Sequence, residues 1–391
     1  MEKSYDVIVI GAGAAGMMCA AIAGQRGRRV LLLDHADKPG KKILISGGGR
    51  CNFTNMHCEP ENFLSRNNHF CKSALARYTQ YDFLAMVEKH GIAWHEKTLG
   101  QLFCDGSARE IVAMLRSECE AGGVVLRTGC KIGEVTKGER FCVATDAGDF
   151  SAASLVLATG SLSIPKMGAT GFAHDIARRF GLALTEIRPA LVPLTFTSEA
   201  LEMMRPLSGV SLDCRATCDG MAFREGMLLT HRGLSGPAIL QVSSYWREGK
   251  TIALDLVPER DAGEALVAAK KERGRGEPKT ALGTILPARL AGAFAAEIPA
   301  KRMADMPDKT LRELGAKLNA WRLEPSGTEG YAKAEVTLGG IDTDGLSAKT
   351  MEARAVPGLY AVGEAVDVTG WLGGYNFQWA WSSGWVAGMA A

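Results

Sequence analysis

A glycine-rich turn between two apolar segments constrains the fold of this chain more than any other feature. Residues 5–10 (YDVIVI) form a continuous apolar run, which is typical of a strand buried in a parallel sheet. The turn GAGAAG follows at 11–16, an alanine-rich helical segment comes next, and residues 28–34 (RRVLLLD) indicate a second strand that ends in an acid. The pattern predicts a βαβ unit, and therefore an α/β domain of the Rossmann type that binds a dinucleotide.

Each glycine of this turn has a separate physical role. Gly11 permits the tight turn, Gly13 lets a pyrophosphate approach the main chain, and Gly16 lets the helix pack on the strand. Ala14 and Ala15 begin the helix, whose free N–H groups and dipole face the anion. The alternative is a glycine-rich turn in another kind of α/β protein, but the flanking strands and helix favour a dinucleotide.

The acid that ends the second strand is expected to bind a ribose. Asp34 follows the first glycine by about twenty residues, the spacing at which a carboxylate accepts hydrogen bonds from ribose hydroxyls. A carboxylate also disfavours a 2′-phosphate, so the sequence predicts that the bound nucleotide is not NADP. The alternative is a solvated acid at a strand end.

The segment KKILISGGGRCNFTN, 41–55, indicates FAD rather than NAD. It forms a basic, glycine-rich loop where an NAD dehydrogenase would normally continue with another βα repeat. Its glycines let the main chain approach phosphate or an isoalloxazine ring, and its cations offset phosphate charge. A structural ion pair for the arginine and solvent exposure for the lysines are the alternatives. The predicted cofactor contacts of this segment are Lys42, Gly48, Gly49, Arg50, Cys51 and Asn52.

The C-terminal segment 358–388 supplies a second indication of FAD. A strand at 359–362 ends in a Gly-Glu pair, as in flavoproteins that hold the ribityl chain there, and a helix is expected from about Asn376. The N-terminus of that helix would stabilise negative charge on the flavin pyrimidine edge by about 0.3–2 kcal/mol. Core packing is the favoured alternative for the aromatic residues of this helix. The predicted contacts are Gly363, Glu364, Gly374, Tyr375, Asn376 and Phe377.

Two further segments are expected to pass the cofactor. An apolar strand at 154–157 ends in Ala158, Thr159 and Gly160, where the chain leaves the domain. Near Ile132, extended main chain is expected to pair with the adenine edge.

Composition excludes several classes of function. The chain has 391 residues and a net charge of +2, so no global basic field indicates nucleic acid, and none is expected as a partner. The basic run RGRGEPK, 273–279, is interpreted as a solvated loop. The ten cysteines lack CxxC or zinc spacing, which predicts reduced thiols, no metal and a cytoplasmic location. The first strand begins at about Tyr5, so no signal peptide is expected, and no stretch indicates a membrane span.

The order of motifs along the chain resembles one known family. GAGAAG, GGGRCNFTN, THRGLSGPAIL and GGYNFQWAWSSG occur in succession from end to end. The chain is similar to bacterial NAD(P)/FAD-dependent oxidoreductases of the aminoacetone-oxidase-like and 3-dehydro-bile-acid-reductase-like type. The resemblance implies an FAD domain that is split in sequence by a β-rich and a helical insertion. The expected parts are FAD-binding residues 1–190, a barrel-like β-rich domain at 191–255, a small helical domain at 256–325, and FAD-binding residues 326–391.

The resemblance also implies a reaction. Hydride would pass from NAD(P)H to flavin N5 and then to a small organic acceptor such as an activated C=C bond. The sequence has no second GxGxxG, so nicotinamide is expected to dock only transiently. An amine oxidase that uses O₂ and a non-catalytic flavin- or RNA-associated protein are the alternatives. His231, Tyr375 and Asn376 are weak candidates for catalytic groups.

Overall fold

The computed structural model describes residues 4–391, except for the side chain of Ser198. The chain forms two compact units. Unit 1 comprises residues 1–188 and 336–391, and unit 2 comprises residues 189–335. The predicted β-rich and helical insertions both lie in unit 2, and the chain returns to unit 1 ten residues after the predicted boundary at 325/326.

Unit 1 is built on a sheet whose core strands are parallel. β1 (Ser4–Ile10) lies between β2 (Val30–Leu33) and β10 (Phe150–Leu157), and the register pairs Ile10 with Leu33 and Leu157. Residues 7–10, 30–33 and 155–157 of these strands are apolar and buried, as is typical of a parallel sheet that is covered on both faces. Three other strands extend the sheet: β7 (Val125–Arg127) pairs with β2, β8 (Ile132–Lys137) pairs with β9, and β20 (Leu359–Ala361) pairs with β10. The remaining strand is β9 (Phe141–Thr145), which pairs antiparallel with β10.

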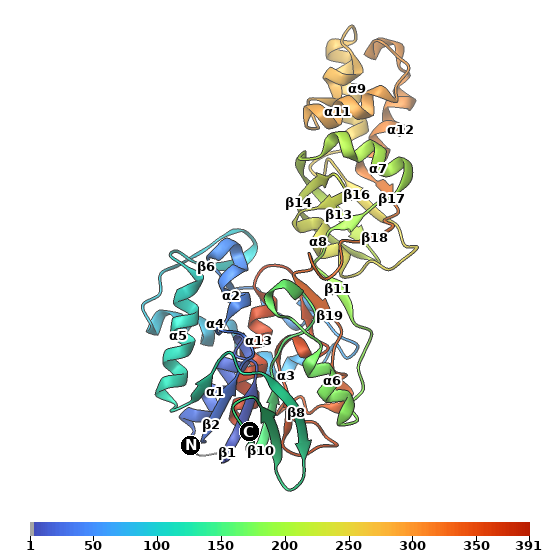
Figure 1. Ribbon diagram of the computed structural model, residues 1–391. Helices are drawn as coiled ribbons and strands as arrows, with labels where there is room; N and C mark the ends of the chain where they lie inside the picture. Colours follow the sequence, from blue (N-terminus) through green and yellow to red (C-terminus); the bar gives the residue numbers. More distant parts are fainter. Residues whose placement is uncertain (1–3) are drawn as a thin grey trace. The chain divides into compact units, whose positions relative to one another are not determined.

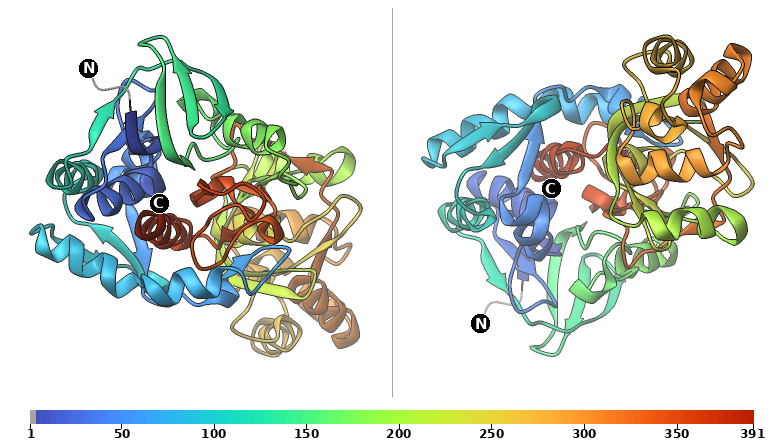
Figure 2. Two further views of the ribbon diagram at one scale, coloured as in Figure 1. Left: turned by 90° about the horizontal axis from the view of Figure 1, so that it is seen from below. Right: turned by 90° about the horizontal axis from the view of Figure 1, so that it is seen from above.

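The helix that follows β1 packs against the last helix of the chain. α1 (Ala14–Gln25) and α13 (Tyr375–Ala390) lie side by side, as Figure 2 shows in blue and dark red. Two glycines of α13 permit this close approach, because a Cβ atom at Gly384 would lie 2.5 Å from the Ala15 carbonyl oxygen and one at Gly388 would lie 2.7 Å from that of Cys19. The C-terminal residues therefore complete the domain that the N-terminal residues begin (Figure 1).

Smaller elements of unit 1 surround this sheet. A three-stranded antiparallel sheet has the order β3–β6–β5, and β4 pairs with β21. The strands are β3 (Asn52–Asn55), β4 (Phe63–Leu64), β5 (Trp94–Glu96), β6 (Gln101–Cys104), β19 (Val336–Leu338) and β21 (Thr369–Gly370). The helices are α2 (Lys41–Ile45), α3 (Cys71–Arg77), α4 (Gln80–Lys89), α5 (Ala108–Ala121) and α6 (Phe172–Arg179).

Unit 2 combines one antiparallel sheet with a group of helices. The sheet has the order β17–β16–β13–β14–β15–β12–β18. Its strands are β12 (Leu194–Thr195), β13 (Ser211–Cys218), β14 (Met221–Thr230), β15 (Gly233–Ser235), β16 (Ile252–Asp255), β17 (Trp321–Leu323) and β18 (Gly327–Thr328). The chain enters the unit through β11 (Arg188–Ala190). The helices are α7 (Ser198–Met204), α8 (Pro237–Ser243), α9 (Ala262–Arg273), α10 (Pro278–Leu282), α11 (Ala288–Ala296) and α12 (Asp308–Asn319).

Candidate active site

The fingerprint turn has the geometry that its glycines predict. Gly11 has φ of 109°, and a Cβ atom there would lie 2.4 Å from the Ala158 carbonyl oxygen. A Cβ atom at Gly16 would lie 1.8 Å from the Gly11 carbonyl oxygen, so α1 packs directly on the turn. Gly13 differs, because no heavy atom lies within 4 Å of the place its Cβ would take. The N-terminus of α1 is therefore open where a pyrophosphate would bind.

Asp34 faces the same turn. Its Oδ2 accepts a hydrogen bond from the Ala12 main-chain nitrogen at 2.6 Å, and its Oδ1 accepts one from that of Ala36 at 2.8 Å. The carboxylate thus braces the turn and retains lone pairs for ribose hydroxyls, because each carboxylate oxygen can accept more than one bond.

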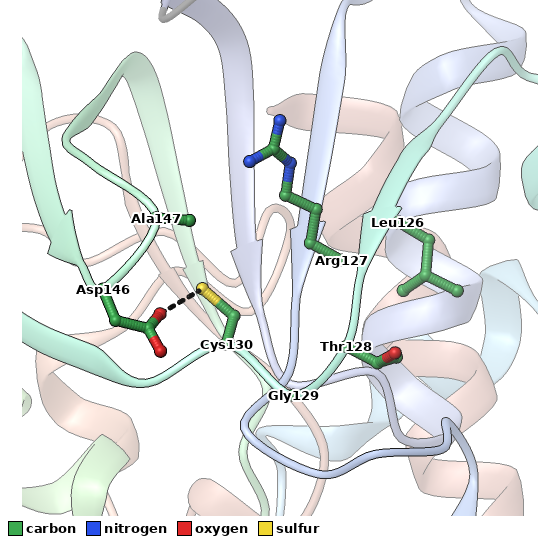
Figure 3. A pocket seen from close by; sticks show the side chains of 7 residues that line it. All are labelled: Leu126, Arg127, Thr128, Gly129, Cys130, Asp146 and Ala147. Atoms are coloured by element: carbon green, nitrogen blue, oxygen red, sulfur yellow. Dashed lines mark hydrogen bonds between the residues drawn. The ribbon is translucent and has the colours of Figure 1, made fainter.

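A pocket of about 490 Å³ lies beside Asp34. The Cys130 main-chain nitrogen donates to the Asp34 carbonyl oxygen at 2.9 Å, which joins the lining of the pocket to the end of β2. Ile132, the residue predicted to meet adenine, begins β8 two positions beyond Cys130. Figure 3 shows the Cys130 thiol turned toward Asp146, to which it donates a hydrogen bond of 3.6 Å. The lining residues are Leu126, Arg127, Thr128, Gly129, Cys130, Asp146 and Ala147.

The segment 41–55, which the sequence predicts to be a basic glycine-rich loop, begins with a helix instead. Residues 41–45 form the short helix α2, and the glycines follow in the turn Ser46–Gly49, where Gly47 and Gly48 have left-handed rather than helical main chain. Gly48 and Gly49 have φ of 67° and 87°, and no heavy atom lies within 4 Å of either missing Cβ. Their main chain is therefore open to a ligand, as the sequence predicts.

Cys51 and Arg50 occupy opposite environments beside these glycines. Cys51 has φ of 51° and is fully buried, and burial raises the pKa of its thiol, so it is a packed side chain rather than a reactive thiolate. The Arg50 side chain is exposed and forms no ion pair with another described residue. The structural ion pair considered for this arginine is absent from residues 4–391.

The 41–55 and C-terminal segments converge, although more than 300 residues separate them. Asn55 Nδ2 donates to the Gly373 carbonyl oxygen at 2.9 Å. Gly374 has φ of 100°, and a Cβ atom there would lie 2.3 Å from the Thr54 carbonyl oxygen. Asn52 contacts Gln101 at 3.1 Å on the neighbouring strand. The two segments predicted to contact the flavin ring therefore contact each other and form one wall of the candidate flavin site.

Lys42 and Glu364 form an ion pair that the sequence does not predict. Lys42 Nζ lies 2.6 Å from Glu364 Oε2 and donates to Ser163 Oγ at 2.7 Å. Glu364 Oε1 also accepts a hydrogen bond from the Ser163 hydroxyl at 2.7 Å and one from the Thr337 main-chain nitrogen at 2.9 Å. Lys42 thus balances a carboxylate, whereas the sequence assigned it to phosphate. Gly363, just before Glu364, abuts α1, since its Cβ would lie 2.9 Å from that of Ala15.

The loop after β10 leaves polar atoms without partners. The hydroxyls of Thr159 and Ser161 are buried and form no hydrogen bond with any described residue. Gly160 between them has φ of 69°, with open space where a Cβ would lie. Buried hydroxyls normally have partners. These orphaned donors and the open glycines fit an elongated ligand with phosphates and a polar chain, which is the chemistry of FAD.

The weak catalytic candidates have different surroundings. Asn376 Oδ1 accepts from the Gly370 main-chain nitrogen and its Nδ2 donates to the Gly370 carbonyl oxygen, both at 2.8 Å, so its amide fixes a loop. Tyr375 is buried and its ring contacts those of Phe63 and Trp371. His231 is exposed in the turn between β14 and β15 of unit 2. A catalytic role for any of these three residues stays a prediction.

The aromatic residues of α13 pack in the core or, at Phe377 and Trp385, partly buried against it, as the favoured alternative predicted. Trp379 and Trp381 are buried, and the Trp381 ring stacks on Phe83 at 4.3 Å and on Phe377 at 5.6 Å.

Ser163 and Thr337 were not identified from the sequence, because single hydroxyl residues in a loop and a short strand carry no pattern.

The comparison with protein families matches this chain over almost its whole length. The model of the HI0933-like protein Rossmann domain covers residues 5–390. The chain is 52% identical to "Ribosomal RNA dihydrouridine synthase" of Escherichia coli (strain K12), over 98% of this chain and 97% of that protein. It is 43% identical to the protein of the same name in Haemophilus influenzae, over 100% and 99%. It is 28% identical to "3-dehydro-bile acid delta(4,6)-reductase" of Clostridium scindens, over 98% of each chain.

Solved structures share the fold at low sequence identity. The 3-ketosteroid-delta4-(5alpha)-dehydrogenase from Rhodococcus jostii RHA1 is 14% identical, with a TM-score of 0.50 over 99% of this chain and 97% of that one. The Mycobacterium smegmatis Sdh1 complex in the apo form is 18% identical, with a TM-score of 0.51 over 99% and 67%. The predicted fold class, the cofactor FAD and an oxidoreductase activity are confirmed.

One prediction about partners is wrong. The sequence was expected to have no nucleic acid partner, but two relatives that match end to end are named for a reaction on ribosomal RNA. Net charge was a poor guide because an enzyme needs only a local basic surface to bind RNA. In residues 4–391 no helix has both the length and the apolarity needed to cross a bilayer.

Proposed function

The chain belongs to the family of the HI0933-like protein Rossmann domain, and we propose that it is an FAD-dependent ribosomal RNA dihydrouridine synthase. The observation that carries this proposal is 52% identity to a protein of that name over 98% of the chain. The predicted acceptor class, an activated C=C bond, is retained, and its carrier changes from a small molecule to RNA. The uracil C5=C6 bond is conjugated to a carbonyl, so it accepts a hydride as an enone does.

The bound flavin would supply hydride transfer, with NADH or NADPH as the electron donor. The open main chain at Gly13 and the N-terminus of α1 would hold the pyrophosphate. Asp34 would bind the adenosine ribose, and the pocket beside Cys130 would take the adenine. A ribosomal RNA substrate and ten free cysteines are consistent with a location in the cytoplasm.

The wall around the flavin ring would come from three segments far apart in the sequence. The Lys42–Glu364 ion pair links α2 to the turn after β20, and Ser163 links both to the loop after β10. These contacts would fix the segments around the ribityl chain and the ring, because Ser163, which bonds both charged side chains, is almost fully buried. Tyr375 is retained as a candidate group for the proton that must accompany the hydride.

The test is direct conversion of RNA. Purified yellow protein would be incubated anaerobically with deproteinised bacterial ribosomal RNA and either NADH or NADPH. The RNA would then be digested to nucleosides, which would be analysed by mass spectrometry. We expect a uridine that has gained the mass of two hydrogen atoms, formed only with protein and reductant together. Flavin that is reduced by nicotinamide but never reoxidised by RNA would contradict the proposal.

A reductase of small conjugated ketones is the second candidate. The relative from Clostridium scindens, 28% identical over 98% of the chain, favours it. A 3-oxo-Δ4 steroid added to the same reduced protein distinguishes the two: reoxidation of the flavin by the steroid and not by RNA would establish this second function.

A further inference from the structure

Positive charge is segregated within unit 2. Residues 189–335 contain 20 Lys and Arg and 19 Asp and Glu, a net charge of +1. Segments 271–279 and 301–305 alone contain six cations and three carboxylates, a net charge of +3. The rest of the unit is therefore left with 14 cations and 16 carboxylates, a net charge of −2.

The two segments are adjacent although 21 residues separate them in the sequence. The Met303 main-chain nitrogen donates to the Gly276 carbonyl oxygen at 2.9 Å, and that of Ala304 donates to the Gly274 carbonyl oxygen at 2.8 Å. The turn between α9 and α10 is thereby joined to the segment that precedes α12. The six cations, all exposed, form what we term the basic cluster: Lys271, Arg273, Arg275, Lys279, Lys301 and Arg302.

The cations of the basic cluster form no ion pairs with the residues that the structure describes, whereas several other cations of unit 2 are paired. Elsewhere in unit 2, Arg312 contacts Glu264 at 2.8 Å, Lys317 contacts Glu297 at 2.7 Å, and Lys250 contacts Asp219 at 2.7 Å. No cation of the cluster forms an ion pair with any residue that the structure describes, although Glu272, Glu277 and Asp305 belong to the same two segments. Six cations with free N–H donors match a polyanion whose phosphates lie along a chain.

We propose that the basic cluster binds the phosphate backbone of the ribosomal RNA substrate. The choice of RNA rests on the proposed function, whereas the presence of an anion-binding surface rests on the charge distribution alone. Phosphate contacts position a protein on nucleic acid without reading its sequence. The cluster therefore contributes affinity and placement of the RNA, and the selection of the uridine belongs to the site in unit 1.

Salt dependence of RNA binding tests the proposal. Full-length protein with bound FAD would be titrated with deproteinised ribosomal RNA between about 50 and about 300 mM KCl. The variants are Arg273→Ala with Arg275→Ala, and Lys301→Ala with Arg302→Ala. The matched control is Arg215→Ala with Arg322→Ala, two exposed arginines on β13 and β17 that also lack an ion pair among the described residues.

Each cluster variant should lose two phosphate contacts. We expect affinity to fall by about tenfold or more, and the slope of log affinity against log salt to become shallower by about 1.5–2. The control, which loses the same charge, should keep the wild-type slope, and all three variants should keep the flavin spectrum. Wild-type slopes in both cluster variants, or an equal loss in the control, would overturn the proposal.

Two further outcomes separate this proposal from the proposed function. If the wild-type protein forms dihydrouridine but the cluster variants bind RNA normally, only the proposal that the cluster binds RNA is overturned. If the wild-type protein forms no dihydrouridine, the proposed function is overturned, and the salt slopes of RNA binding still test the role of the cluster. Cluster variants that bind free RNA normally but fail to bind ribosomal subunits would show that the cluster contacts protein, which also overturns the proposal.

Discussion

At the scale of single residues, the glycines of the site fall into two groups that the sequence cannot distinguish. At Gly13 the missing Cβ would meet open space, whereas at Gly374 it would lie 2.3 Å from the Thr54 carbonyl oxygen, with φ of 100°. The first position is open toward a ligand and the second is required by the fold. Valine should therefore impair the protein at both positions, by blocking the ligand at Gly13 and by disrupting the fold at Gly374.

Gly13→Val should abolish FAD retention without unfolding the protein. Its φ of −85° suits any residue, and the new side chain occupies only the space predicted for pyrophosphate. Absorbance of the purified protein measures bound flavin, and circular dichroism measures the fold. Gly374→Val is the contrasting variant, and it should lose folded protein as well as flavin. A fully yellow Gly13→Val protein would refute the phosphate assignment.

Lys42→Met should weaken FAD binding and lower stability, because it leaves the half-buried Glu364 carboxylate without its cation. We expect a cost of about 1–3 kcal/mol, since a charged acceptor loses a partner. Lys41→Met is the matched control: Lys41 pairs at 2.8 Å with the exposed Asp37, which lies four residues earlier and outside the helix. FAD titration and thermal melting should leave the control unchanged; equal effects in both variants would contradict a role for the Glu364 pair.

At the scale of elements, the contact between α1 and α13 determines whether the two ends of the chain form one site. Gly384→Ala would place a methyl group 2.5 Å from the Ala15 carbonyl oxygen, so the helices must separate. We expect a loss of about 1–3 kcal/mol and weaker FAD binding, because Ala15 lies in the first turn of α1.

The matched control for this substitution is Gly292→Ala in α11. There the new methyl group would meet only the Lys279 side chain at 3.6 Å, so alanine should stabilise the helix by up to about 1 kcal/mol. Thermal melting of both variants checks the contrast. Similar melting temperatures would mean that α1 and α13 tolerate separation.

A second element-scale contact predicts a dependence on pH. Glu118 on α5 accepts hydrogen bonds from His90, Lys89 and Gln25 at 2.7, 3.0 and 2.7 Å, which ties the ends of α4 and α1 to α5. Burial raises the pKa of Glu118, but these bonds outweigh it and lower the pKa from 4.5 to about 2. The folded pKa lies below the unfolded one, so the stabilisation is present above pH 4.5 and is lost as pH falls toward 2.

Glu118→Gln should therefore melt below wild type at pH 6, and the difference should shrink steadily toward pH 3. The matched control is Glu120→Gln, two residues along the same helix, where an exposed carboxylate lies 3.5 Å from Arg116. Melting curves across this range should show no such convergence for the control. A difference that stays constant with pH would exclude the charge of Glu118 as the cause.

At the scale of the whole molecule, the candidate FAD site and the basic cluster belong to different units. The residues that fit FAD lie in unit 1, and the basic cluster lies in unit 2. Where two units unfold independently, a ligand stabilises only the unit that binds it. Scanning calorimetry of the apoprotein should resolve two transitions, and added FAD should raise the midpoint of only one. A single transition that moves as a whole would show that the units unfold together.

The sequence by itself determined the local parts of the candidate FAD site. The strand–turn–helix at 4–25, the acid at 34, the glycines at 47–49 and the Gly-Glu pair at 363–364 could be predicted because each depends on main-chain conformation within a few residues. The pattern of apolar strands also determined the fold class. The boundary of α2 was missed because five residues are too few to show a helical period.

Only the tertiary structure decided which of these parts meet. The Lys42–Glu364 pair and the Ser163 contacts join segments 121 to 322 residues apart, and no local pattern specifies such a partner. The same holds for the basic cluster, where two main-chain hydrogen bonds bring two solvated segments together. Its six cations form no ion pair with any residue that the structure describes. Charge acts through space, so its meaning depends on the distances that folding sets.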